Sequence, residues 1–131
     1  MFEELAMTIH LKDACRQILT EDSSIRFAGF SDKFGKQIAG EYRNGLKPLL
    51  TESQLDLSAI ESIIRMNTRR DLESQTGKPI YSFTLYEKIR RATISLDNKD
   101  YSILMVSFDL NADHESIILN KIISIAIEWS G

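Results

Sequence analysis

Very little in this sequence points to covalent or metal chemistry. There is one cysteine, Cys15, so no internal disulfide can form, which suits a reducing compartment. The only two histidines, His10 and His114, are not spaced as the i, i+4 pair of a zinc site. The phosphate-binding patterns G-x-x-x-x-G-K-[ST] and G-x-G-x-x-G are also missing. We therefore expect neither a metal nor a cofactor.

Signals for membranes and secretion are missing as well. The opening "MFEELAM" has no basic region followed by a long apolar stretch, and no run of about 18 apolar residues occurs. The net charge of −3 does not suit a molecule that coats nucleic acid or an anionic membrane. These features favour a cytoplasmic protein without membrane contact.

The composition is that of an ordinary folded chain. With 131 residues, 43% of them hydrophobic, the chain is long enough to bury about two thirds of its unfolded surface around one core. Because no linker, repeat or low-complexity segment interrupts it, we expect a single domain over residues 1–131.

Turn residues and apolar periodicity together predict an α-β-β-α-β-β-β-α order. The T-x-x-Q of Thr51 and Gln54 is a capping box that starts the middle helix, and Gly77 with Pro79 ends it. Gly35 closes the first hairpin. The expected segments are a helix at 2–20, strands at 25–30 and 36–42, a helix at 51–76, strands at 80–87, 89–96 and 101–109, and a helix at 113–129.

The last strand is apolar on both of its faces. Ile103, Leu104, Met105 and Val106 are consecutive, whereas a strand with one wet face alternates between apolar and polar residues. Such a strand must be covered on both sides. We therefore predict that it lies centrally in one sheet with helices above and below it, which is an α+β fold.

The last helix is also unusually apolar. One stripe, Ile118, Ile122, Ile125 and Trp129, suffices to cover the sheet. A second stripe of Leu119, Ile123, Ala126 and Ile127 exceeds that need. It is expected either to pack on the first helix, 2–20, or to form an exposed patch for association.

This order, together with the hairpin "IRFAGFSDKFGKQIAG", resembles the profilin-like domains of the dynein light chain roadblock family. The hairpin shares the family's apolar strand, acidic-glycine turn and second apolar strand. The resemblance implies a five-stranded antiparallel sheet with one helix on one face and two on the other. The phrases "YSFTLYEKIRRATI" and "SFDLNADH" also resemble small archaeal proteins, which implies no function.

The roadblock resemblance also implies a way of working. Such proteins often dimerise through the middle helix and the following strand, here 51–76 and 80–87, and regulate small GTPases or act as scaffold subunits. We therefore expect a non-enzymatic interaction module that forms a homodimer. Leu57, Ile60 and Ile64 would lie at the centre of the contact, with arginines at its rim.

A basic block at 65–91 is the best candidate for a site. It holds seven basic residues, Arg65, Arg69, Arg70, Lys78, Lys88, Arg90 and Arg91, against the three acidic residues Asp71, Glu73 and Glu87. Arginine forks suit carboxylates and phosphates. The interaction residues expected are Arg65, Arg69, Arg70, Lys88, Arg90 and Arg91, which would contact an acidic protein partner. A plain solvated face is the alternative reading.

Other functions stay open at this point. Tyr81, Phe83 and Tyr86 interleave with the basic block, as they would in a protein that stacks single-stranded nucleic acid. A sensor of the PAS type, a class with a related sheet, would hold a small ligand between sheet and helix, near Tyr81, Tyr86 or Tyr101. An enzyme would depend on Cys15 or His114, but no set of acid, base and nucleophile can be assembled from their spacing.

The stretch "DLNADHES" has the D-x-N-x-D spacing of a calcium loop. However, the sixth position is His114 instead of glycine, and the twelfth is Asn120 instead of glutamate. The same residues suit the start of a helix, which Asn111 or Asp113 would cap. We therefore expect a capped helix and no calcium site.

Overall fold

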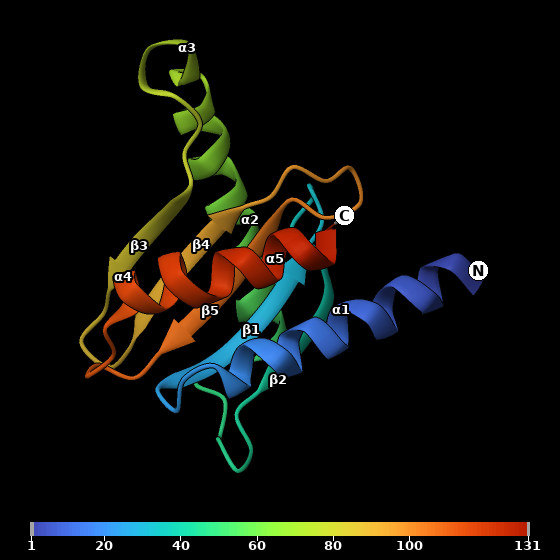
Figure 1. Ribbon diagram of the computed structural model, residues 1–131, viewed down its shortest axis with the longest axis vertical. Helices are drawn as coiled ribbons and strands as arrows, with labels where there is room; N and C mark the ends of the chain where they lie inside the picture. The colour runs from blue at the N-terminus through green and yellow to red at the C-terminus, as the bar shows by residue number, and fades with distance from the viewer. Residues whose placement is uncertain (1, 131) are drawn as a thin grey trace.

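The computed structural model describes residues 2–130, with side-chain burial described for 2–128. Figure 1 shows the arrangement of the elements. They are α1 (Phe2–Thr20), β1 (Ile25–Ser31), β2 (Gln37–Tyr42), α2 (Glu52–Arg70), α3 (Glu73–Thr76), β3 (Tyr81–Leu85), β4 (Arg90–Ser95), β5 (Ile103–Phe108), α4 (His114–Ile117), the π-helical turn η1 (Ile118–Ile122) and α5 (Ile123–Ser130).

All five strands form one antiparallel sheet in the order β2-β1-β5-β4-β3. The doubly apolar strand is therefore central, as predicted. Ile103, Leu104, Met105 and Val106 are all buried. Burial of each such side chain contributes about 1.5–3 kcal/mol, so this segment anchors both layers of the core.

Helices cover both faces of the sheet. In Figure 1, α1 and α5 lie in front of the strands and α2 lies behind them. Leu104 and Val106 pack into the main core with α1 and the C-terminal helix, whereas Ile103 and Met105 pack against Ala59 and Ile63 of α2. The expected sheet, with two helices on one face and one on the other, is confirmed.

The β1–β2 turn depends on an aspartate and a glycine. The Asp32 carboxylate accepts hydrogen bonds from the backbone N–H groups of Phe34 at 2.9 Å and Lys36 at 3.0 Å. Gly35 has φ +86°, a left-handed conformation that glycine adopts at little cost. These local interactions explain why the hairpin could be predicted from the sequence.

The middle helix begins as predicted but ends earlier. The Thr51 hydroxyl accepts from Gln54 N at 3.2 Å, and the Gln54 side chain accepts from Thr51 N at 3.0 Å. Helix α2 ends at Arg70, and the short α3 follows before Gly77. No residue of α3 is buried, so no packing holds these turns in line with α2.

The apolar residues of α2 divide between two faces. Ile63 is buried beside Ala59 and Met66, facing the sheet. Leu57, Ile60 and Ile64 point the opposite way and are 58%, 41% and 59% exposed. The helix is therefore apolar on its outer surface as well as toward the core.

The C-terminal helix contains a π-helical turn that the sequence did not reveal. Asp113 caps its start by accepting from Ser116 N at 3.4 Å. The expected first stripe, Ile118, Ile122 and Ile125, is buried; the side chain of Trp129, its fourth member, lies outside the described residues. In the second stripe Ala126 is buried and Ile123 packs on the core, whereas Leu119 and Ile127 are exposed.

Helix α1 packs beside the C-terminal helix. This was one of the two arrangements expected from the second apolar stripe of the C-terminal helix. Leu11, Cys15 and Ile18 of α1 share a core with the C-terminal helix. Phe2, Leu5 and Ile9 remain exposed because the first turns of α1 extend past the sheet (Figure 1). None of the helices in the described part of the chain, residues 2–130, combines the length and the apolar character that a membrane span requires.

Candidate functional site

The polar face of β4 meets one flank of α2. Strand alternation places Ala92 and Ile94 in the main core, and so turns Arg91, Thr93 and Ser95 toward α2. The groove between this flank and strands β3 and β4 is here named the arginine groove. It is lined by Ser62, Arg65, Arg69, Ser82, Phe83, Thr84, Tyr86, Arg91 and Thr93.

Arg91 lies deepest among the three arginines and donates to neutral partners. Its Nη1 donates to the Ser58 hydroxyl, and its Nη2 donates to Met105 Sδ at 3.3 Å. Burial lowers the pKa of the Arg91 guanidinium, an effect that Arg65 reinforces and the Tyr86 hydroxyl and Glu61 oppose. The side chain stays charged because arginine loses its proton only far above neutral pH.

Arg65 and Arg69 reach the same groove from α2. They lie four residues apart, on the same side of the helix. Across residues 2–130, neither they nor Arg91 have a carboxylate within ion-pair distance. Three guanidinium groups therefore converge in this groove, and none of them is paired with an acidic side chain of the described residues.

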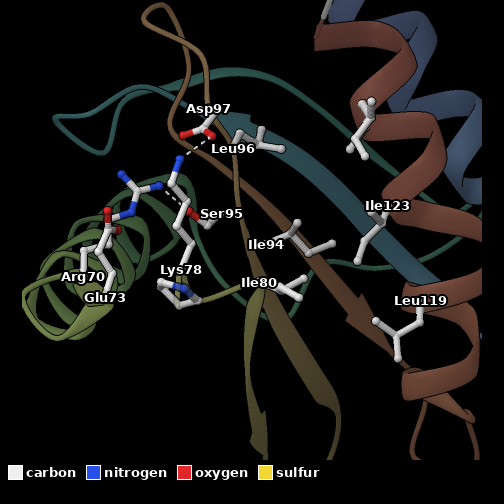
Figure 2. A pocket seen from close by; sticks show the side chains of 13 residues that line it. Arg70, Glu73, Lys78, Ile80, Ile94, Ser95, Leu96, Asp97, Leu119 and Ile123 are labelled. Carbon is white, nitrogen blue, oxygen red and sulfur yellow. Dashed lines mark hydrogen bonds and ion pairs between the residues drawn. The ribbon is translucent and has the colours of Figure 1, made fainter. Parts of the chain in front are cut away.

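Arg70 lies elsewhere, at the end of a separate broad groove of about 930 Å³ between the start of β3 and α5. Figure 2 shows Arg70 donating to the Ser95 hydroxyl and Lys78 paired with Asp97. The floor is apolar, with Ile80 and Leu119 among its residues. Three of the four charged residues that line this groove, Arg70, Lys78 and Asp97, thus already have partners within the chain.

The other two predicted site residues are also apart from the arginine groove. Lys88 is exposed on the β3–β4 turn, outside the arginine groove, but it lines a neighbouring hollow along α2 together with Arg91. Arg90 faces the opposite side of the sheet, where its Nε donates to the Leu110 carbonyl at 2.8 Å and its Nη1 lies 3.2 Å from His114 Nδ1. The structure therefore brings together Arg65, Arg69 and Arg91 in the arginine groove, leaves Lys88 beside it, and separates Arg70 and Arg90 from it.

An apolar hollow of about 570 Å³ continues from the arginine groove along α2. Its lining includes Leu49, Leu50, Leu57 and Tyr86. Strand β3 borders this region and pairs only with β4, so its outer edge has no strand partner within residues 2–130. The surface combines an exposed aliphatic helix face, an open strand edge and a cationic groove.

The residues considered for catalysis are poorly placed for it. Cys15 is fully buried, and burial raises the pKa of its thiol to about 12, so the nucleophilic thiolate is scarcely populated. The His114 ring stacks on Phe83 with centroids 3.7 Å apart. Burial, and next the charge of Arg90, lower the pKa of His114, which favours the neutral imidazole.

The calcium-loop spacing has a different role here. The Asp109 carboxylate pairs with Arg26 at 3.0 Å and Arg43 at 2.8 Å, and Asp113 caps the C-terminal helix. Two guanidinium groups already hold Asp109, the first residue of the supposed loop. Among residues 2–130 there is no cluster of His, Cys, Asp or Glu suited to a metal.

The tyrosines expected around a sensor cavity do not converge. Tyr81 packs on the main core, and Tyr101 contacts Phe30 edge-on at 5.5 Å between centroids. Tyr86 is exposed beside the arginine groove. The three tyrosines therefore do not enclose a common ligand chamber between sheet and helix.

Sequence reasoning missed part of this surface. Thr84 and Thr93 line the arginine groove, and Leu49 and Leu50 line the apolar hollow. The alternation Arg91, Thr93, Ser95 was a signal that could have placed Thr93 beside Arg91. Nothing local marked Leu49 and Leu50, because their position depends on how the loop before α2 folds back.

The sheet order and the placement of helices on both faces define the roadblock-like class of α+β folds. Solved structures of this class superpose on nearly the whole chain. The gliding protein MglB from Thermus thermophilus gives a TM-score of 0.73 at 15% identity, covering 95% of this chain and 91% of that one. A roadblock/LC7 domain from Streptomyces avermitilis gives 0.69 at 9% identity, covering 89% and 92%.

A third solved structure, described as MglB with a tetrameric arrangement, gives a TM-score of 0.64 at 18% identity, covering 89% of this chain and 88% of that one. No protein-family model and no curated protein sequence matches this chain. At these identities the likeness shows the fold, which is that of MglB and the roadblock/LC7 domains. The expected resemblance is confirmed at that level.

Proposed function

We propose that this chain is a non-enzymatic interaction module that forms a homodimer through the outer face of α2 and the edge of β3. Two observations support this most: the exposed stripe of Leu57, Ile60 and Ile64 on α2, and the outer edge of β3, which has no strand partner within residues 2–130. Exposed aliphatic patches of this kind mark association surfaces. An open edge offers backbone N–H and C=O groups to a second strand.

A two-fold contact uses both features at once. Two β3 edges paired antiparallel continue the sheet, and the two α2 helices then meet through their outer stripes. The solved MglB structure described as tetrameric supports self-association in this fold. The arginine groove lies between α2 and β3, the two elements of the proposed contact. Its basic side chains would attract an acidic protein surface, such as that of a small GTPase, to the assembled dimer.

Leu57→Glu and Ile64→Glu test the dimer directly. Each places a charge at the centre of the proposed contact, and loss of such a central residue weakens association by about tenfold or more. Leu5→Glu is the matched control because Leu5 and Leu57 are both 58% exposed. Light scattering across a range of concentrations should give twice the chain mass for the wild type and Leu5→Glu, and the chain mass for the other two.

A wild type that stays monomeric when concentrated would count against the homodimer. A dimer that Leu5→Glu breaks and Leu57→Glu leaves intact would move the contact to α1. Neither result requires a known partner protein. Leu5→Glu and Leu57→Glu both change exposed residues, so both variants should fold normally.

A further inference from the structure

We propose that the arginine groove binds one phosphate group of a ligand. Arg65 and Arg69 from α2 and Arg91 from β4 would hold the phosphate oxygens, and the hydroxyls of Thr84 and Thr93 line the same space. The site is complete within one chain, so the inference does not require the proposed homodimer.

The number and direction of the donors favour phosphate over a carboxylate. A planar carboxylate is satisfied by one guanidinium fork, whereas a phosphate presents several oxygens in different directions. Here forks approach from a helix on one side and a strand on the other. Ser58, Met105 and the Tyr86 side chain are hydrogen-bond partners of Arg91, which has five N–H donors, and Met105 Sδ is a weak acceptor.

The charge balance also favours a dianion. The three arginines lack an ion-pair partner within the described residues, and Glu61 is the nearby acid that acts on Arg91. The local sum is three positive charges and one negative charge. A phosphate monoester carries nearly two negative charges at neutral pH, so it would neutralise this excess.

The size of the groove limits what can enter. Its cavity volume is about 40 Å³. That holds about three water molecules at roughly 10–15 Å³ of accessible volume each. The space suits a single phosphate group and excludes a base or sugar. The rest of a ligand would extend outward past the exposed Tyr86.

Calorimetric titration of the full chain with inorganic phosphate tests the proposal, with sodium acetate and sodium chloride compared at equal ionic strength. Phosphate should bind with a saturable, one-to-one heat. Arg91→Gln should weaken the binding by about tenfold to a hundredfold, as for lost hydrogen bonds to a charged group. Arg65→Gln, on the exposed flank of α2, should also weaken phosphate binding. If Arg91→Gln does not fold, the phosphate affinity of Arg65→Gln tests the proposal.

Arg90→Gln is the matched control, because Arg90 is the neighbour of Arg91 on the same strand but faces the other side of the sheet. It should bind phosphate as the wild type does. Equal heats for phosphate, acetate and chloride would overturn the proposal, as would equal losses in Arg65→Gln and Arg90→Gln.

Two further arms identify the source of the phosphate. Glycerol phosphate represents a small metabolite, and a short phosphoserine peptide represents a modified protein. The compound with the lower dissociation constant shows which kind of phosphate-bearing molecule the groove accepts. Leu57→Glu should retain phosphate binding. Loss of the dimer with phosphate binding kept, or the reverse, therefore separates a failure of this proposal from a failure of the proposed homodimer.

Discussion

Asp109 is the residue that ties the end of β5 to its neighbours. Its carboxylate pairs with Arg26 of β1 and with Arg43, which follows β2. The hydrogen bond from Arg43, with a further one from Arg26, lowers the pKa of Asp109 despite opposing desolvation. The folded state therefore favours the ionised carboxylate, so the free energy of unfolding depends on pH in the acidic range.

Asp109→Asn should lower the free energy of unfolding by about 1 kcal/mol at neutral pH, a modest figure because a third of the side chain is exposed. A lowered folded pKa contributes stability above the ordinary value of 3.8, and that contribution is lost as the pH falls through the folded pKa. Denaturant unfolding of both proteins should show their difference shrinking below that value. A constant difference down to strong acid would contradict the ion-pair account.

At the scale of elements, the β1–β2 turn and α2 fit against each other closely. A Cβ on Gly35 would lie 2.4 Å from Ile60 Cγ1 and 3.0 Å from the Ile60 backbone. The hairpin therefore reaches α2 only because Gly35 has no side chain. This contact helps to set where α2 lies over the sheet, and so where its outer stripe points.

Gly35→Ala should destabilise the protein by about 2 kcal/mol or more, because it adds a steric clash to the cost of a left-handed alanine. Gly45→Ala is the control: Gly45 also has positive φ, at +78°, but nothing lies within 4 Å of its Cβ position. It should cost only the conformational penalty of about 1 kcal/mol. Equal melting temperatures for the two variants would show that the hairpin moves away from α2 at no cost.

At the scale of the whole molecule, the proposed homodimer predicts that stability depends on protein concentration. Only folded chains associate, so dimer formation stabilises the native state over the unfolded state. Dilution should therefore lower the melting temperature of the wild type. Leu57→Glu should melt at the same temperature at every concentration. Calorimetry over a hundredfold range of protein concentration checks this, and a wild-type value independent of concentration would exclude a dimer that stabilises the fold.

Several features of the fold were readable from the sequence because their causes are local. Thr51 and Gln54 cap α2 through bonds three residues apart, and Asp32 and Gly35 shape a turn of five residues. The unbroken apolar run at 103–106 required cover on two sides, which placed β5 at the centre of the sheet. The expected α+β order followed from these signals.

The site was only partly readable for a physical reason. The helical period groups Leu57, Ile60, Ile63 and Ile64 as one apolar set, but the direction of the sheet decides that Ile63 is buried while the other three are exposed. The excess of basic residues at 65–91 is likewise visible in the sequence, but the sequence does not show which of these side chains lie on the same surface.

The main helices and strands, their order and the central strand could be predicted from the chain alone, since caps, turns and burial patterns act within a few residues. The meeting of Arg65, Arg69 and Arg91, the opposite direction of Arg90 and the π-helical turn at 118–122 came from the three-dimensional packing. Those outcomes depend on which distant segments pack together, because the free energy of packing belongs to pairs of surfaces and not to any one stretch of chain.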